Sequence, residues 1–427
     1  MPQKGTVPGI TYMKGDALSH LPRTEKKHSL FSRVRKGGSS RMRPLLATTA
    51  VLLLAPQVAA GIFPAGLPSA TTAPWGAWLV QIVDQDFVSA GTHSLAIDDS
   101  GQKHVFYARF QPTELIHATD DGSQWNEQVV ATAGIPAGMV TGPGGLVHLL
   151  QKDLPYLVYH RLNGDTHNVE VVDNRGVDRR DIAVDTAGGV HLAYNLPSDL
   201  LVYAYRAPAG GWMLQTIASD AANEVEIAVG GDGTVHIVYV PSSFLDARYV
   251  FRDVSGTWTN EEIPGCVSFL DIALDSEGTA NVVCWYYDGV YFNRRLATDS
   301  WERTRIEGSA RNGYDAALAI DSDDKPHVAY SMQLGPSGDD LVNHPRPKYA
   351  SPGLDGWFVE SLDHDGMFNG LRPSIQVDSH DRPHVLYAYS YRAKTIDAVL
   401  DQDDLLNPHS QLRLATPVAS VLGAVEN

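Results

Sequence analysis

Apolar and polar residues alternate along this chain in short runs that recur at a nearly constant spacing. Each run ends in Asp or a similar polar residue, a turn containing Gly follows, and the chain returns through His-Val-x-Tyr or a variant of it. In residues 181–185, Ile182 and Val184 share one face, which is the two-residue period of a strand. The seven copies cover residues 94–107, 139–151, 181–194, 226–239, 271–284, 317–330 and 374–387.

The length of the repeat indicates its architecture. The recurring His position advances in steps of 44, 43, 45, 45, 46 and 57 residues. Each step has room for four strands joined by tight turns, and a four-stranded unit of this length is typical of a β-propeller blade. We therefore predict an all-β chain that forms a seven-bladed β-propeller of four-stranded antiparallel blades.

Tryptophan marks the fourth strand of most blades. The seventh copy is followed by a third strand, expected at about 395–400, but by no strand with Trp. Residues 76–83, which contain Trp78, resemble the missing strand, so we expect the N-terminal strand to complete the last blade and close the ring. The alternative, an open row of stacked sheets, would leave two sheet edges unpaired. The recurring tryptophans are Trp125, Trp212, Trp258, Trp301 and Trp357.

The N-terminal region lacks the repeat and has the pattern of an export signal. Residues 1–41 form a basic polar extension, and 42–60 combine a charged start, a short apolar run and small residues ending at Ala60. Cleavage near Ala60 predicts a secreted or periplasmic protein. Two alternatives stay open, namely a true start at Met42 and an uncleaved anchor. We expect a linker at 61–74, the propeller at 75–400 and a tail at 401–427.

The net charge of the chain excludes some classes of binding partner. The formal net charge is −17, and residues 1–60 hold 10 of the 33 basic and 2 of the 50 acidic residues, so the remainder carries −25. Such a surface repels nucleic acid and anionic membranes. We expect neither as a partner once the signal is removed, and we expect a monomer without a cofactor.

Two cysteines and a set of histidines raise the question of special chemistry. Cys266 and Cys284 are the only cysteines, and Cys284 occupies the position that is Tyr in five other copies, so we expect a buried free thiol. A disulfide stays open, because sequence alone does not place two Cα atoms within bridging distance. One His recurs per blade, far from its copies, so we expect each to bond a turn Asp or a backbone carbonyl rather than a metal.

Residues 119–125 resemble the Asp-box, or BNR repeat, Ser-x-Asp-x-Gly-x-Thr-Trp. Asp120, Gly122 and Trp125 match, and the other two motif positions differ. The chain is thereby similar to secreted bacterial β-propellers of the sialidase-like type with degenerate repeats. The resemblance implies the fold. Sialidases also need three converging arginines, a Tyr–Glu pair and a Phe/Tyr-Arg-Ile-Pro motif, which the chain does not show, so we do not expect this enzyme activity.

Acidic residues gather at one position of the repeat, four residues before the turn Asp. Three adjacent blades supply Asp181, Glu226 and Asp271 there, and the innermost strands of a propeller face its channel. These carboxyls are candidates for binding sugar hydroxyls, holding a cation or acting as an acid–base pair. The alternative is a solvated acidic rim. The seven residues at this position are Ser94, Gly138, Asp181, Glu226, Asp271, Ala317 and Ser374.

The loops beside this position vary from blade to blade, and variable loops on a rigid scaffold commonly carry function. Their aromatic, amide and charged residues suit a carbohydrate platform. The long loop at 331–348 could equally be a simple surface loop. The candidate ligand-binding residues are Arg179, Arg180, Arg311, Tyr314, Asp315, His344, Asp365 and Arg372.

These observations favour a secreted propeller that binds a ligand, and above all a carbohydrate, at the mouth of its central channel. One alternative is a glycoside hydrolase or polysaccharide lyase that uses Asp181, Glu226 and Asp271. The other is a scaffold for an extracellular protein. Differing loops favour a single site, and two opposed carboxyls about 5–10 Å apart would favour glycosidase chemistry.

Overall fold

Strands make up almost the whole of the part of the chain that is described. The computed structural model describes residues 77–84, 93–110, 113–243, 246–308, 313–333, 345–362, 368–391 and 409–418. One short 3-10 helix, η1 (Pro143–Gly145), lies between two strands. The strands are β1 (Ala77–Asp84), β2 (Ser94–Ile97), β3 (Lys103–Phe110), β4 (Thr113–Asp120), β5 (Trp125–Ala131), β6 (Ile135–Gly142), β7 (Leu146–Asp153), β8 (Tyr156–Asn163), β9 (Thr166–Asp173), β10 (Arg180–Val184), β11 (Val190–Asn195), β12 (Leu201–Arg206), β13 (Trp212–Ala218), β14 (Ala221–Val229), β15 (Val235–Pro241), β16 (Ala247–Arg252), β17 (Trp258–Ile263), β18 (Ser268–Leu274), β19 (Ala280–Tyr286), β20 (Gly289–Ala297), β21 (Ser300–Gly308), β22 (Gly313–Ile320), β23 (Pro326–Gln333), β24 (Pro345–Gly353), β25 (Gly356–Ser361), β26 (Phe368–Val377), β27 (Pro383–Tyr391) and β28 (His409–Val418).

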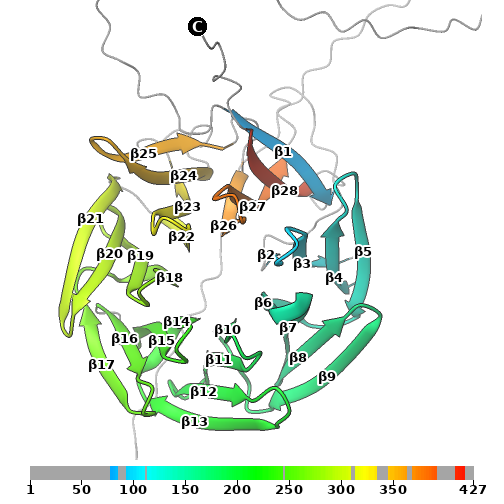
Figure 1. Ribbon diagram of the computed structural model, residues 1–427, viewed down its shortest axis with the longest axis horizontal. Coiled ribbons are helices and arrows are strands. Elements are labelled where there is room, and N and C mark those ends of the chain that lie inside the picture. The colour runs from blue at the N-terminus through cyan, green and yellow to red at the C-terminus, as the bar shows by residue number, and fades with distance from the viewer. Residues whose placement is uncertain are drawn as a thin grey trace, which may run out of the picture. The chain divides into compact units, whose positions relative to one another are not determined.

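The strands form seven four-stranded antiparallel sheets, which confirms the predicted seven-bladed β-propeller. Blades 1 to 6 take four consecutive strands each, from β2–β5 to β22–β25, and blade 7 has the order β26-β27-β28-β1. Figure 1 shows the sheets arranged around a central axis, with the first strand of each blade innermost. Second strands such as β11 are buried along their whole length, because each sheet packs between two others.

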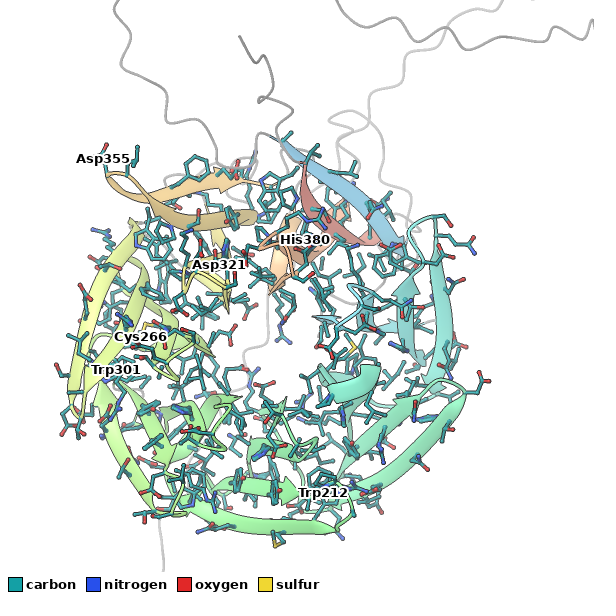
Figure 2. All side chains as sticks on the ribbon, in the orientation of Figure 1. Trp212, Cys266, Trp301, Asp321, Asp355 and His380 are labelled. Atoms are coloured by element: carbon teal, nitrogen blue, oxygen red, sulfur yellow. A yellow bond between two sulfur atoms is a disulfide. The ribbon has the colours of Figure 1, made fainter. Side chains whose placement is uncertain are left out.

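The recurring tryptophans join neighbouring blades. Trp212, Trp258 and Trp301 each pack edge-on against a tyrosine in the third strand of the preceding blade, and Figure 2 labels Trp212 and Trp301. Such aromatic pairs stabilise beyond the apolar area that they bury. The ring centroids lie 5.3 Å apart in Tyr159–Trp212, 5.2 Å in Tyr203–Trp258 and 5.4 Å in Tyr249–Trp301.

The strand at the N-terminal end of the described chain belongs to the last blade. β1 pairs antiparallel with β28 from Ala77–Val418 to Asp84–Leu412. Its Trp78 packs on Tyr349 of blade 6 with the ring centroids 5.0 Å apart, as those three tryptophans do on their preceding blades. On the other side, Val83 shares a core with Leu95 of blade 1, so apolar contacts connect the last blade to the first.

The third strand of blade 7 is later in the sequence than predicted. We expected it at about 395–400 and a tail from 401, whereas it is β28, His409–Val418. The propeller therefore extends beyond residue 400, and 395–400 lie outside the described residues. The spacing of the other blades misled the prediction, because the chain between β27 and β28 is longer than the corresponding connections.

The expectation of a free thiol is wrong, because Cys266 and Cys284 form a disulfide with their Cα atoms 5.5 Å apart. In blades 3, 4 and 6 the tyrosine at the position of Cys284 donates a hydrogen bond to a carboxylate at the junction leading into its blade. Cys266 lies at the same junction of blade 5, so the disulfide replaces this bond. The equivalent bonds are Tyr194–Asp173, Tyr239–Asp220 and Tyr330–Glu307, each 2.7 Å long.

No helix within the described residues is both long and apolar enough to span a membrane.

Candidate functional site

The strand register brings the seven predicted positions into one ring. Each pairs with the residue two places after the recurring His or Asn of its second strand, as in Asp181–Ala193, Glu226–Val238 and Asp271–Val283. The same pairing holds for Ser94, Gly138, Ala317 and Ser374. All seven residues line a single cavity of about 560 Å³ at the channel.

Two of the three acids connect adjacent blades. Asp181 accepts a hydrogen bond of 3.0 Å from the backbone N–H of Ile227 in blade 4, and Asp271 accepts one of 2.7 Å from Leu318 in blade 6. Innermost strands present unpaired backbone N–H groups to the channel, and these carboxyls satisfy some of them. Ser374 does the same for Leu95 of blade 1 at 3.2 Å. This position therefore has a structural role that the sequence did not reveal.

Glu226 has a different environment from the other two acids. Its side chain interacts with the carboxyl of Asp181, and no backbone N–H among the described residues of the next blade donates to it. In that next blade, Asp271 accepts from Ile272 N–H at 2.8 Å. Burial and then the negative charges of Asp181 and Asp271 raise the pKa of Glu226 well above its usual value. Burial also raises the pKa of Asp181 to about 6 and that of Asp271 to about 7. The three carboxyls therefore hold protons at a pH where ordinary carboxyls have lost them.

A second ring lines the same cavity two residues earlier in the sequence. Because side chains alternate along a strand, residues two apart share a face. Most of these residues lie at β-bulges, for example between Asn223 and Val225 and between Tyr314 and Ala316. The second ring consists of Arg179, Glu224, Phe269, Asp315 and Arg372.

The backbone of this second ring is strained. Glu224, Phe269, Asp315 and Arg372 have φ values of +35°, +53°, +31° and +51°. Residues with a β-carbon seldom adopt positive φ, at a cost of about 1–3 kcal/mol each, and such residues concentrate at binding and catalytic sites. The bulges turn these four side chains toward the cavity, which marks the channel mouth as the leading candidate site.

The second ring contains both positive and negative side chains. Arg372 Nε lies 3.8 Å from Asp315 Oδ2, and both side chains are partly exposed. Burial raises the pKa of Asp315, while Arg372 and Arg179 oppose the increase. Glu224 accepts a 2.9 Å hydrogen bond from Leu270 N–H, and burial raises its pKa to about 7. The mouth thus offers cations, carboxyls and the ring of Phe269 to one ligand.

The remaining predicted residues have mixed outcomes. The guanidinium of Arg180 lines the cavity but already donates to the carbonyl oxygens of Asp178 and Pro136, and burial lowers its pKa to about 10. Tyr314 lies in β22, and its side chain is not described. Arg311, His344 and Asp365 lie outside the described residues.

The sequence reasoning missed Glu224 and Phe269. Both lie two residues before a predicted acid, as Arg179 does relative to Asp181. The offset between Arg179 and Asp181 was the available signal, but bulges at the start of β14 and β18 interrupt the two-residue period on which such an extension would rely.

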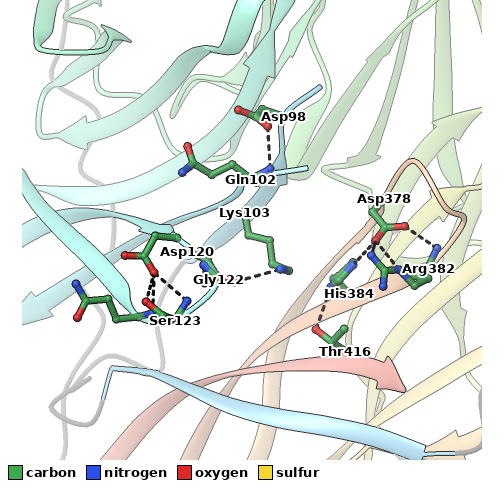
Figure 3. Close-up of polar contacts among 12 residues, drawn as sticks. Asp98, Gln102, Lys103, Asp120, Gly122, Ser123, Asp378, Arg382, His384 and Thr416 are labelled. Atoms are coloured by element: carbon green, nitrogen blue, oxygen red, sulfur yellow. Dashed lines mark hydrogen bonds and ion pairs between the residues drawn. The ribbon is translucent and has the colours of Figure 1, made fainter. Parts of the chain in front are cut away.

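The recurring Asp follows the opposite end of the innermost strand, and the recurring His lies beside it in the second strand. The predicted bond between the two is present in blades 3, 6 and 7. His384 Nε2 lies 3.0 Å from Asp378 Oδ2, and its Nδ1 lies 3.0 Å from Thr416 Oγ1 (Figure 3). His191 and His327 contact their turn aspartates at 3.1 Å in the same way. Within the described ranges, no group of three or more His, Cys, Asp or Glu side chains could hold a metal ion.

The turn that resembles an Asp-box is held by its own side chains. Asp120 accepts a 2.8 Å bond from Gly122 N–H and contacts Lys103 Nζ at 3.1 Å (Figure 3). Asp121 accepts from the N–H groups of Ser123 and Gln124, both at 2.8 Å.

Comparison with known proteins adds support for the fold. No family model and no curated protein matches the chain. A streptogramin B lyase structure is similar over 80% of this chain and 99% of its own, with 9% identity and a TM-score of 0.54. YCF48 bound to D1 peptide is similar over 84% and 100%, with 11% identity and a TM-score of 0.53. A fungal alcohol oxidase in complex with copper is similar over 80% and 76%, with 10% identity and a TM-score of 0.53. At such identities these similarities show the β-propeller fold alone.

Proposed function

We propose that this propeller binds a carbohydrate at the mouth of its central channel. The observation that carries the proposal is the strained second ring, where bulges turn Glu224, Phe269, Asp315 and Arg372 into one cavity of about 560 Å³. Cavities of this size suit a small ligand, and an aromatic ring beside charged groups can stack on a sugar and bond its hydroxyls.

The same geometry argues against a glycosidase that uses Asp181 and Glu226 as its two carboxyls. Each of these carboxyls shifts the pKa of the other through a direct side-chain interaction, whereas the carboxyls of glycosidases lie about 5–10 Å apart to flank the bond that is cleaved. Binding is therefore the better supported function of this pair.

Glycan-array binding by the whole chain tests the proposal. Arg372→Gln and Arg179→Gln each remove one cation of the mouth, and Arg305→Gln makes the same change on the outer strand β21. A lost charged hydrogen bond should weaken binding about tenfold or more in the mouth variants. The control should bind like the wild type. Folded wild-type protein that binds no displayed glycan, or mouth variants that bind unchanged, would contradict the proposal.

Export of the protein is part of the same proposal. The signal-like pattern of residues 42–60 and the disulfide between Cys266 and Cys284 both support it, because disulfides persist in oxidising compartments. Expression in a bacterial host, followed by N-terminal sequencing, should find exported protein that begins near Gly61. Protein that stays in the cytoplasm with residues 1–60 intact would overturn this part.

A further inference from the structure

A charged contact recurs where the middle blades meet. In blades 3, 4 and 5 an arginine at the end of the third strand faces the tryptophan of the fourth strand. In two of these blades the arginine reaches a glutamate in the fourth strand of the preceding blade. Arg206 contacts Glu170 and Arg295 contacts Glu261, both at 2.7 Å.

The junction between blades 3 and 4 departs from this pattern. Gln215 takes the place of the glutamate, since Gln215 faces Tyr203 as Glu170 faces Tyr159 and Glu261 faces Tyr249. Arg252 occupies the arginine position. Its guanidinium makes no ion pair or hydrogen bond with another described residue. This junction therefore has the arginine of the recurring contact but not the glutamate that binds it at the flanking junctions.

A groove of about 570 Å³ lies at this junction. Arg252 and Gln215 line it together with Tyr205 and the exposed side chains of Met213 and Leu214. The lining residues come from blades 3 and 4, and none of them lines the cavity at the channel mouth. Figure 1 shows the strands that carry most of them, β12, β13 and β16, outside the innermost strands.

The polar groups of the groove that are available to a ligand are donors. The side-chain oxygen of Gln215 already accepts from the indole N–H of Trp258 at 3.2 Å, so the groups that Gln215 can offer to a ligand are its amide N–H donors. Asp185, which also lines the groove, already accepts from His191 and from the N–H groups of Ala187 and Gly189. A guanidinium and an amide donor together match the two oxygens of a carboxylate.

We propose that the groove between blades 3 and 4 binds a carboxylate, which takes the place that Glu170 and Glu261 fill at the flanking junctions. The apolar side chains of Met213 and Leu214 and the ring of Tyr205 would contact the aliphatic part of the ligand. This site is separate from the channel mouth. The carboxylate could belong to a small organic acid or to an acidic side chain of a peptide, since both present the same group.

The proposal is tested by adding carboxylate probes to the whole chain and monitoring the NMR signal of the Trp258 indole N–H. The probes are acetate, N-acetylglutamate amide and the uncharged N-acetylglutamine amide. Gln215→Glu supplies the missing carboxylate from within, and Arg252→Gln removes the cation. Both variants should weaken binding of the charged probes about tenfold or more, whereas Arg305→Gln should not. Gln215→Glu should also raise the unfolding temperature, which shows that the variant is folded and that the new ion pair has formed.

Each outcome decides one point. Binding of acetate and the glutamate probe alike supports a site for small carboxylates, and binding of the glutamate probe alone supports an acidic side chain as the source. Equal binding of the glutamine probe, binding that Gln215→Glu leaves unchanged, or no binding of any charged probe would overturn the proposal. None of these outcomes bears on glycan binding at the mouth.

Discussion

Aspartates at the two ends of the same innermost strand behave in opposite ways. Asp275 follows β18 at the turn end, and Asp271 lies within β18 at the channel end. Burial disfavours the charge of both groups, but hydrogen bonds from Thr279 and Arg294 hold the pKa of Asp275 below its usual value. The pKa of Asp271 rises to about 7, because burial and the charge of Asp181 outweigh its two backbone donors.

The difference distinguishes groups that hold the fold from groups that are available for function. A carboxylate that accepts hydrogen bonds from several donors stays ionised, as Asp275 and Asp378 do. A carboxyl buried among other carboxyls keeps its proton near neutral pH and can exchange it or share it with a ligand. The same contrast separates Asp185 from Asp181 in blade 3.

The largest effect is expected at the turn end. Asp275→Ala removes an acceptor of bonds from Thr279 N–H at 2.8 Å and Arg294 Nη2 at 2.9 Å. The loss should lower the free energy of unfolding by about 2–3 kcal/mol. Urea unfolding at pH 7 measures it, and Asp275→Asn, which keeps one acceptor, is the matched control. A loss no larger than that of Asp271→Ala would remove the distinction between the two ends.

A smaller effect is expected at the channel end of the same strand. Asp271→Ala leaves the N–H groups of Ile272 and Leu318 without their acceptor, which should cost about 1–2 kcal/mol. Asp271→Asn is uncharged like the protonated carboxyl and keeps one of the two acceptor oxygens, so at pH 6 it should cost less than Asp271→Ala, about 0.5–1 kcal/mol. If Asn is as damaging as Ala, then Asp271 is needed as an anion and its raised pKa is contradicted.

The smallest effect has the opposite sign. The pKa of Glu226 is raised in the folded chain, so its contribution to stability is present below the unfolded pKa and is lost as the pH rises through the folded pKa. Glu226→Gln cannot lose a proton. It should therefore match the wild type at pH 5 and exceed its free energy of unfolding by about 1 kcal/mol at pH 8. Paired urea titrations at the two pH values measure this difference, and a constant difference would show that Glu226 does not titrate in this range.

The sequence located the acidic ring because its position is defined within each copy of the repeat. Asp181, Glu226 and Asp271 occupy the same position in three of the seven aligned copies of the repeat. Each of them has the same pairing with the second strand of its blade, so the three lie at the same height in the channel. Glu224 and Phe269 escaped notice because bulges change the alternation at the start of these strands. Bulges depend on how the chain enters each blade, and the repeat pattern does not encode this.

The disulfide is a second feature that the alignment of the repeats did not predict. The alignment placed Cys284 at a tyrosine position, but the partner of that tyrosine lies at a blade junction, where the copies share little sequence. In the structure, the disulfide between Cys266 and Cys284 lies where Tyr194 and Tyr239 donate their hydrogen bonds in blades 3 and 4.

The sequence by itself determined the number of blades, the strands of most of them and the structural role of the recurring Asp and His, because these follow from local periodicity and from contacts within one repeat. Tertiary structure alone decided which carboxyls have raised pKa values, which arginine makes no ion pair with a described residue and where β28 pairs. Protonation depends on burial and on charges from other blades, and ion pairs depend on side chains that meet across a junction. Neither is a property of any single copy of the repeat.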